Sequence, residues 1–260
     1  MTLLRALRQK KNRSELGLFV AEGHKLVLEL LASDVKVKTI YATENWLGEN
    51  SEFLENAGET VKVNEEELSR ISSLVTPQEV LAIAEIPQYS IDFSRLLKDY
   101  CLLLDGIRDP GNLGSIIRIA DWFGIRDIIC SPDSADTWNP KVVQASMGSL
   151  LRVRLHEMLP TDFISQMKKK AEEFRLTVPP VYGTFLNGND IYKTDFPASG
   201  VIVIGNESNG IRPETEKWIS RKITIPSWKI KGDAIGNPES LNAAIATAIV
   251  CSEVRRGKRE

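Results

Sequence analysis

The chain has 260 residues, of which 42% are hydrophobic and 26% are charged, and its formal net charge is -2 at pH 7. This length exceeds the roughly 100 to 200 residues of one ordinary domain, so we expect a globular protein of two domains. The small net charge argues against a protein that coats nucleic acid by bulk electrostatics, and the longest apolar runs fall short of the ~20 residues of a membrane span.

Three cysteines, Cys101, Cys130 and Cys251, lie far apart and form no C-x-x-C pair. We therefore expect neither a disulfide framework nor a metal site. The first residues include no sustained apolar stretch, so no secretory signal is evident. These features together predict a cytoplasmic protein that is not bound to a membrane.

Basic residues cluster near both ends of the chain: Arg5, Arg8, Lys10, Lys11 and Arg13 near the start, and Arg255, Arg256, Lys258 and Arg259 near the end. Such clusters neutralise phosphates, and they are equally typical of solvated termini. Charge alone leaves both interpretations open.

Residues 19–84 alternate between expected strands and helices. The pattern predicts a short strand, a glycine break and a helix within 19–31, strands at 37–42, 61–63 and 80–84, and helices at 46–57 and 65–72. A polar stretch without clear periodicity follows at 87–94. We place the domain boundary there, which gives an N-terminal α/β domain of residues 1–93 and a C-terminal domain of residues 94–260.

From residue 100 onward, apolar runs of strand length end in Gly, Asp or Asn, and helical segments follow them. The expected strands are 101–104, 127–130, 151–155, 178–182, 201–204 and 222–225. The expected helices lie near 112–123, 140–145, 162–174, 213–219 and 239–254. Continuous apolar strands that alternate with helices predict an α/β domain with a mainly parallel sheet covered by helices on both faces. Ligands of such sheets bind beyond the carboxyl ends of the strands.

The first segment with unusual composition is Leu104–Ala120. Its glycines and Pro110 predict a tight turn at the end of a strand, and Asn112 is placed to cap the next helix. Arg118 stands among Ile116, Ile117 and Ile119. An arginine in such surroundings needs an anionic partner or access to a cleft, although a simple pair with Asp121 is the alternative.

Two further segments follow later strands. Glu207 lies in a glycine-bounded polar loop after the strand at 201–204, where it either contacts a substrate or interacts with the start of the next helix. Ser240 and Asn242 stand at the start of a helix that is apolar on nearly every side. The alternative to a functional role is that one of them is simply the N-cap of this helix, as Ser and Asn usually are at such a position. No G-x-x-x-x-G-K-[ST] occurs in the chain, so the loop at Glu207 is not the phosphate-binding loop of a nucleotide hydrolase. No G-x-G-x-x-G follows any strand, which disfavours a nucleotide-dependent oxidoreductase.

Together the three segments resemble the signature motifs of the SpoU (TrmH-type) RNA ribose methyltransferases of the SPOUT superfamily. These motifs are an Asp-Pro-x-Asn-x-Gly turn with a downstream Arg, then Gly-x-Glu-x-x-Gly, and then Ile-Pro followed by Ser-Leu-Asn. The resemblance covers about residues 100 to 255. Residues 19–23 and 76–80 also resemble the family's N-terminal substrate-binding domain, which has a fold like that of ribosomal protein L30.

The resemblance implies a trefoil knot, formed where the chain after Val201 threads through an earlier loop. It also implies S-adenosylmethionine as the cofactor, an obligate homodimer, and RNA as the substrate, with ribosomal RNA favoured over transfer RNA. The positions that match the family's cofactor contacts are Gly205, Ile225 and Leu241, with Thr184 as a weaker candidate. The positions that match its catalytic residues are Arg118, Asn112, Glu207, Ser240 and Asn242.

The implied reaction transfers a methyl group to a ribose 2'-hydroxyl, which must be held in line with the sulfonium and lose its proton. An arginine, whose pKa stays above ~12, is a poor base. We therefore expect Arg118 to grip the neighbouring phosphate and orient the hydroxyl. Asn112, Glu207, Ser240 and Asn242 would position the ribose and Arg118.

The sequence departs from the family pattern at two places. The stretch of residues 227–238 is longer than the usual linker, and Gln144 stands where many relatives carry Arg. Two alternatives remain within the same fold: a transfer-RNA ribose methyltransferase, and a catalytically silent RNA-binding protein. The presence of all five catalytic positions argues against the silent protein.

Overall fold

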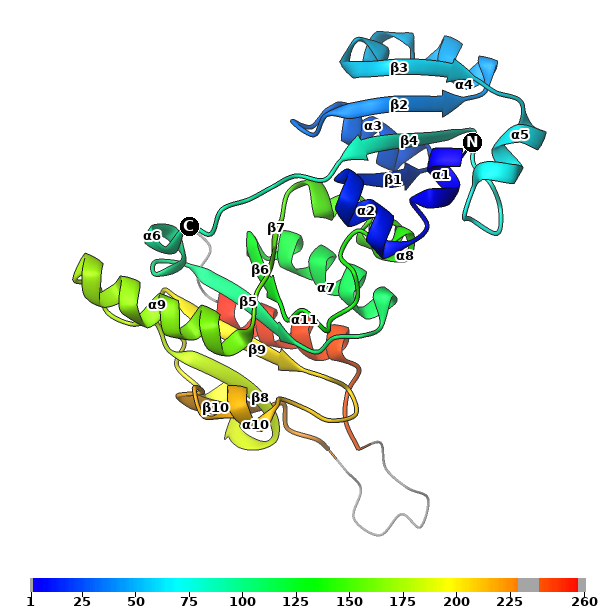
Figure 1. The fold of residues 1–260 in the computed structure, drawn as a ribbon. Coiled ribbons are helices and arrows are strands. Elements are labelled where there is room, and N and C mark those ends of the chain that lie inside the picture. Colours follow the sequence, from blue (N-terminus) through cyan, green and yellow to red (C-terminus); the bar gives the residue numbers. More distant parts are fainter. Residues whose placement is uncertain (1, 229–238, 257–260) are drawn as a thin grey trace, which may run out of the picture. The chain divides into compact units, whose positions relative to one another are not determined.

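The computed structural model describes residues 2–228 and 239–256, which form two compact units (Figure 1). The first unit comprises Met1–Gln88 together with Asp136–Arg152, and the second comprises Tyr89–Ala135 and Val153–Glu260. The chain therefore leaves the second unit after Ala135 and returns to it at Val153.

The first unit is built on a four-stranded sheet of order β1-β4-β2-β3, in which β2 and β3 are parallel and the other neighbours are antiparallel. Its elements, in chain order, are α1 (Thr2–Ala6), α2 (Lys10–Leu16), β1 (Leu18–Glu22), α3 (His24–Leu31), β2 (Val37–Ala42), α4 (Glu44–Glu49), the 3-10 helix η1 (Ser51–Asn56), β3 (Ala57–Lys62), α5 (Glu65–Ile71), β4 (Val80–Glu85), α8 (Pro140–Ser146) and the 3-10 helix η2 (Ser149–Leu151).

The helix expected at 46–57 is wrong in its length, because the structure divides this stretch into α4 and η1. Asn50 ends α4 with its side chain, which donates a hydrogen bond of 2.8 Å to the carbonyl oxygen of Trp46. Strand β3 starts earlier than expected, at Ala57, since its pairing with β2 begins at Val37. The strands expected at 37–42 and 80–84 are confirmed.

Helices α1 and α2 occupy the basic N-terminal segment, so it is not a frayed terminus. Arg13 is 2% exposed and pairs with Asp136, and its Nη1 donates to the carbonyl oxygen of Leu7 at 2.6 Å. Arg8 donates to the carbonyl oxygen of Ser72 at 2.9 Å. These two cations therefore hold the unit together. Of the C-terminal cluster, Lys258 and Arg259 lie outside the described residues.

The second unit is built on a six-stranded sheet of order β10-β8-β9-β5-β6-β7, in which every neighbouring pair is parallel. Its elements are α6 (Phe93–Leu96), β5 (Tyr100–Asp105), α7 (Pro110–Trp122), β6 (Asp127–Cys130), β7 (Arg154–Glu157), α9 (Pro160–Phe174), β8 (Val181–Asp190), the 3-10 helix η3 (Ile191–Lys193), β9 (Gly200–Gly205), α10 (Pro213–Glu216), β10 (Arg221–Thr224) and α11 (Ala243–Arg255).

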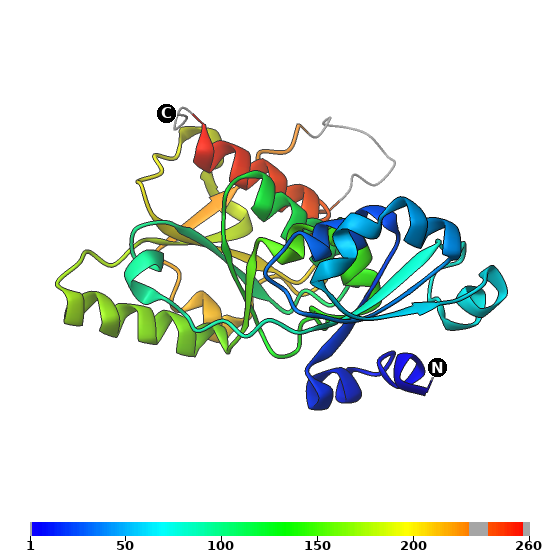
Figure 2. The same ribbon diagram turned by 90° about the horizontal axis from the view of Figure 1, so that it is seen from above.

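Helices cover both faces of this sheet, as Figure 2 shows for α9 on one side and α7 with α11 on the other. On the α9 face, Leu103 and Val203 from neighbouring strands pack with Phe163 and Met167 in one core cluster. On the opposite face, α11 packs against α7 and β9. The α/β class with a mainly parallel sheet is thus confirmed. The threading of the chain after Val201 stays a prediction.

Two strand boundaries differ from the sequence-based expectation for local reasons. Strand β8 starts at Val181 rather than at 178, because Pro179 and Pro180 have no N–H to donate to a ladder. Strand β7 starts at Arg154, since η2 takes up the preceding residues. Helix α10 is also shorter than the segment expected at 213–219.

Candidate active site

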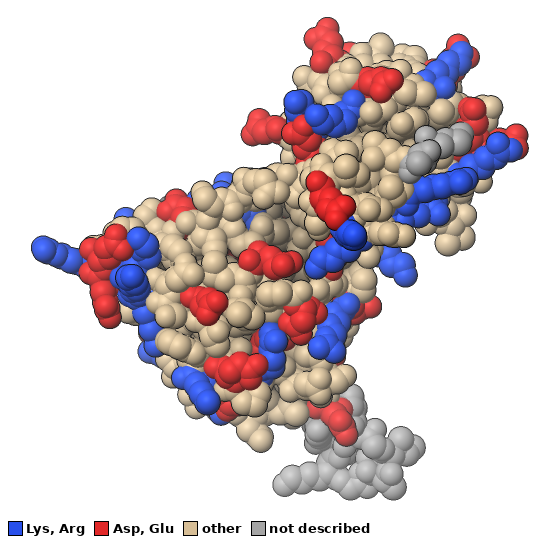
Figure 3. Space-filling model, in the orientation of Figure 1, with Lys and Arg blue, Asp and Glu red and all other residues tan. Residues whose placement is uncertain are grey.

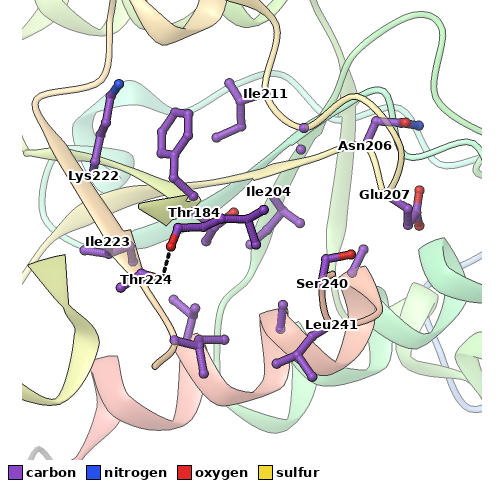
Figure 4. A pocket seen from close by; sticks show the side chains of 18 of the residues that line it. Thr184, Ile204, Asn206, Glu207, Ile211, Lys222, Ile223, Thr224, Ser240 and Leu241 are labelled. Atoms are coloured by element: carbon purple, nitrogen blue, oxygen red, sulfur yellow. Dashed lines mark hydrogen bonds between the residues drawn. The ribbon is translucent and has the colours of Figure 1, made fainter. Parts of the chain in front are cut away.

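A pocket of about 630 Å³ opens in the second unit at the ends of β8, β9 and β10 (Figure 4). The four positions expected to contact a cofactor all line it, together with two of the expected catalytic residues: Thr184, Gly205, Ile225, Leu241, Glu207 and Ser240. Figure 4 shows Glu207 at one end of the pocket and Lys222 at the other. The sheet therefore gathers segments that are far apart in sequence around one cavity, at the edge where parallel sheets bind ligands.

The loop after β9 forms one wall of the pocket, and glycine is required where it begins. A Cβ atom on Gly205 would lie 2.4 Å from the carbonyl carbon of Gly210, which is far inside van der Waals contact. The loop closes on itself, because the backbone of Asn206 exchanges hydrogen bonds of 3.0 and 2.8 Å with that of Gly210. Gly210 has a φ of 67°, a left-handed conformation that glycine adopts without strain.

Asn206, which sequence reasoning missed, holds this loop against the turn after β5. Its Oδ1 accepts hydrogen bonds from the backbone N–H groups of Ser208 and Asn209, at 2.9 and 3.1 Å. Its Nδ2 donates to the carbonyl oxygen of Gly106 at 2.8 Å. The side chain thus fixes the backbone on both sides of Glu207. The feature of the sequence that pointed to this role was an asparagine placed between Gly205 and Glu207.

Three expected catalytic residues from three different segments form one hydrogen-bonded chain. Asn242 Nδ2 donates to Asn112 Oδ1 at 2.8 Å, and Asn112 Nδ2 donates to Glu207 Oε1 at 2.5 Å. Asn242 is also the N-cap of α11, because its Oδ1 accepts from the N–H groups of Ala244 and Ile245. One side chain therefore both starts the helix and joins the site, so α11 begins at Ala243 rather than at 239.

The expectation that Asn112 caps α7 is wrong. Asp109 is the N-cap, and its Oδ1 accepts from the backbone N–H of Asn112 at 2.7 Å, with Pro110 in the first turn. This arrangement leaves the amide of Asn112 available for Glu207 and Asn242. The alternative that Glu207 caps α10 is also wrong, since Arg212 is the N-cap of that helix and no side chain caps it.

Arg118 lies away from this chain of hydrogen bonds. Ile116 and Ile117 are buried, but Arg118 lies on the exposed side of α7 and does not line the pocket. Within the described part of the chain it forms no hydrogen bond or ion pair, so the pair with Asp121 is not formed. Trp122, one turn further along the same side, is 83% exposed.

A buried ion pair that sequence reasoning missed anchors the far side of the loop. Asp105 ends β5 and is 1% exposed, and it accepts hydrogen bonds from Arg212 N at 3.0 Å and Arg212 Nε at 2.6 Å. Arg212 also lies 3.3 Å from Asp133. Although partial burial opposes it, the Ser131 hydroxyl and the Arg212 charge hold the pKa of Asp133 below its ordinary value. A carboxylate at the end of a wholly apolar strand was the available signal.

Two sequence-based expectations concern features away from the pocket: the long stretch at 227–238 and the lack of a metal site. Of the long stretch at 227–238, residues 229–238 lie outside the described residues. Within 2–228 and 239–256, no group of three His, Cys, Asp or Glu side chains is placed to hold a metal ion. Over the same residues, no helix has the length and apolar character that crossing a bilayer requires.

Comparison with known proteins gives relatives over the whole chain. The 23S rRNA (guanosine(2553)-2'-O)-methyltransferase RlmP of Bacillus subtilis is 28% identical over 96% of this chain and 93% of its own length. A TrmH-family protein from Porphyromonas gingivalis superposes with a TM-score of 0.84 at 38% identity, covering 98% of this chain and 96% of its own. An AdoMet-bound rRNA methyltransferase from Sinorhizobium meliloti has a TM-score of 0.83 at 32% identity, covering 100% of this chain and 95% of its own.

Two family models divide the chain between them. Residues 2–82 match the MRM3-like substrate binding domain, and residues 99–252 match the SpoU rRNA Methylase family. The second match contains the pocket and the hydrogen-bonded chain of Asn242, Asn112 and Glu207. The chain belongs to the SpoU rRNA methylase family.

Proposed function

We propose that this protein is an S-adenosylmethionine-dependent RNA 2'-O-ribose methyltransferase that acts on ribosomal RNA. The observation that carries the proposal is the hydrogen-bonded chain of Asn242, Asn112 and Glu207, because it joins the three motifs beside a cofactor-sized pocket. The B. subtilis relative acts on 23S rRNA by its name, and the S. meliloti structure contains AdoMet.

The pocket fits the cofactor in size and in chemistry. Its volume of about 630 Å³ lies in the usual range for small-molecule sites. Ile204, Ile225 and Leu241 supply apolar surface for an adenine ring. Glu216 and Lys222, an ion pair on the wall, carry charges of both signs, as does the amino-acid end of the cofactor. Gly205 leaves the loop backbone open to close approach, since no side chain fits there.

The cofactor supplies an electrophilic methyl group, and the protein has to present a ribose oxygen to it. We assign this task to the Glu207 end of the pocket, where the Asn112 amide and Ser240 lie close to the loop. Glu207 Oε1 is already oriented by Asn112, so the carboxylate is held before RNA binds. The 2'-hydroxyl would pass its proton to the neighbouring RNA phosphate as its oxygen bonds to the methyl carbon, while the bond between that carbon and the cofactor's sulfur would break.

Arg118 enters this account through a second copy of the chain. It is exposed and unpaired within the described residues and lies on one side of α7 with Trp122. The adjacent α11 exposes Ile245 to 54%, and Leu241, just before that helix, is 48% exposed. Apolar side chains of this size, exposed on two packed helices, favour burial against a partner. In a homodimer made through this face, Arg118 would grip an RNA phosphate at the partner's pocket.

We assign RNA binding to residues 1–93 and methyl transfer to residues 94–260, in a cytoplasmic protein. The match to a substrate-binding domain over residues 2–82 supports the first assignment. Acidic and basic side chains are interspersed over the face shown in Figure 3, so local contacts rather than bulk charge must supply RNA affinity.

The test is transfer of a labelled methyl group from S-adenosylmethionine to purified 23S rRNA, with transfer RNA as the comparison and the modified ribose mapped by its resistance to alkali. Methylation of one ribose in 23S rRNA supports the proposal. Label in transfer RNA alone would show a transfer-RNA enzyme instead. Cofactor binding without transfer to either RNA would favour the silent RNA-binding protein.

A further inference from the structure

A second hollow, of about 380 Å³, lies in the first unit and takes no part in the site described above. Three segments form it: the turn from β1 into α3, the loop before β4, and the end of α8. The residues that line it are Glu22, Gly23, His24, Lys25, Leu26, Leu74, Gln78, Gln144 and Met147. Gln144 and Met147 fall within the part of the sequence that matches the methylase family, although they pack with the first unit.

The hollow has one cation, Lys25, and one carboxylate, Glu22, in its lining. Glu22 is its only acid, and its carboxylate is already engaged: Oε2 accepts from the Ser72 hydroxyl at 2.5 Å, and Oε1 accepts from the Ser73 N–H at 3.0 Å. Lys25 is exposed and forms no ion pair within the described residues. Glu22 therefore holds the loop in place, and Lys25 supplies the free charge.

The rest of the lining combines apolar side chains with groups that form hydrogen bonds to the polar edge of a ligand ring. Leu26, Leu74 and Met147 offer apolar contact surface, and the amides of Gln78 and Gln144 each carry a donor and an acceptor. Trp46 Nε1 donates to His24 Nδ1 at 2.9 Å, so neutral His24 has its Nε2–H as the remaining donor. A flat heterocycle with a polar edge and an attached phosphate matches this set.

The backbone at Met147 has an unusual conformation and lies close to α3. Met147 has a φ of 50°, an uncommon conformation for a residue with a side chain, and Gly148 follows with a φ of 85°. A Cβ on Gly148 would lie 2.1 Å from Glu29 Oε2, and the same carboxylate oxygen is 2.9 Å from Arg152 Nη1. The end of α8 is thus clamped to α3. Backbone strain held by its surroundings is typical of ligand-binding positions.

We propose that this hollow is an RNA subsite that receives one unstacked nucleobase, with Lys25 on the adjoining phosphate and Gln78 and Gln144 on the polar edge of the base. The inference rests on the proposed function, because the base would belong to the RNA that the second unit methylates. It gives a chain with a net charge of -2 an RNA contact that does not depend on bulk charge. The amide of Gln144 then recognises the base through hydrogen bonds to its polar edge.

The methionines provide a direct test, because the chain has four and, of the three in the described residues, Met147 alone lines the hollow. The full-length protein is labelled with 13C-methyl methionine and titrated with AMP, GMP, CMP and UMP at millimolar concentrations, with ribose 5-phosphate as the base-free probe. We expect at least one nucleotide to shift the Met147 methyl resonance and to leave those of Met158 and Met167 in place. A silent Met147, or an equal shift with ribose 5-phosphate, would overturn the base subsite.

A kinetic test connects the subsite to RNA. The double variant Lys25→Ala, Gln144→Ala should raise the KM for 23S rRNA about tenfold at unchanged kcat and unchanged cofactor affinity. The matched control is Gln166→Ala, Lys169→Ala, on the exposed side of α9, which should leave KM unchanged. Active enzyme whose KM does not respond to the first double variant contradicts the subsite alone. Absence of methylation by the wild type contradicts the proposed function and leaves the resonance test valid.

Discussion

Asn112 Nδ2 donates a hydrogen bond to Glu207 Oε1, although 95 positions separate the two residues in sequence. The same amide accepts from Asn242 through its oxygen, so both of its ends are used. Asn112 is free for this double contact because Asp109, three positions earlier, caps α7 in its place. The three motifs of the family thus meet at a single amide.

Replacing that amide should slow methyl transfer. In Asn112→Ala, Glu207 and Asn242 each lose a hydrogen bond of about 1 kcal/mol, so we expect kcat to fall about 30-fold. Cofactor affinity should change little, since Asn112 does not line the pocket. Single-turnover transfer to 23S rRNA measures the first quantity, and calorimetric titration the second. The control is Asn45→Ala, an exposed asparagine of α4, and an equal loss in both variants would argue against the assignment.

Two glycine-to-alanine substitutions should have different effects, because Gly205 lies in the crowded loop of the pocket and Gly48 lies in an open position of a helix. Gly205→Ala places a Cβ 2.4 Å from backbone of Gly210, so the loop must shift and the affinity for S-adenosylmethionine should fall at least tenfold. Gly48→Ala meets nothing within 4 Å and lies in α4, so it should raise stability by about 0.5 to 1 kcal/mol. Cofactor titration and urea unfolding measure these effects. Unchanged cofactor affinity in Gly205→Ala would show that the loop does not form the binding wall.

Asp127 makes the free energy of unfolding of the second unit decrease in acid. Burial by itself raises its pKa, but hydrogen bonds from His156 and Arg154 and the charge of Arg95 outweigh this effect and hold the pKa well below its usual 3.8. A folded-state pKa below the unfolded value adds stability above pH 3.8, and this stability is lost as the pH falls further.

The variant Asp127→Asn should therefore cost about 3 kcal/mol of unfolding free energy at pH 7 and less at pH 3, because it leaves the partly buried Arg95 and Arg154 without their partner. Urea unfolding at several pH values measures this. Asp34→Asn, an exposed residue of the first unit, is the control and should show no such dependence. A constant difference between wild type and Asp127→Asn from pH 7 to pH 3 would refute the interpretation.

The shared site predicts complementation between two inactive chains. Arg118→Ala lacks the arginine and Asn112→Ala lacks the amide, so a heterodimer of the two has one intact site if Arg118 acts in the partner's pocket. Random exchange of subunits should then restore about a quarter of the wild-type activity. Sedimentation should show a dimer of the 29.0 kDa chain that dissociates in Trp122→Glu, Ile245→Glu. A wild-type monomer, or no recovery on mixing, would contradict a shared site.

Sequence reasoning expected a strand near each strand of both units, although the bounds of β3, β7 and β8 differ from the expected ones. The parallel strands of the second unit were recognisable because they are continuous apolar runs such as 201–204. It also selected the residues that line the pocket and form the hydrogen-bonded chain, through their resemblance to known motifs. It missed α1 and α2, since the basic residues there suggested a solvated terminus, whereas Arg13 is buried by a partner at Asp136. No local pattern reveals a partner 123 positions away.

The roles of Asp105, Asn206 and Arg212 were missed for a related reason. Each holds backbone on the other side of a turn, so its function exists only once the loops after β5 and β9 are side by side. The side of α7 on which Arg118 lies was misjudged because its neighbours in sequence are apolar, although they face the sheet and Arg118 does not. Sequence neighbours on a helix point in different directions.

The most direct measurement of the central claim combines methyl transfer and cofactor binding in Arg118→Ala. We predict that this variant loses transfer from labelled S-adenosylmethionine to 23S rRNA, while its calorimetric affinity for the cofactor stays within about twofold of the wild type, since Arg118 is not part of the pocket wall. Turnover close to that of the wild type would contradict the account.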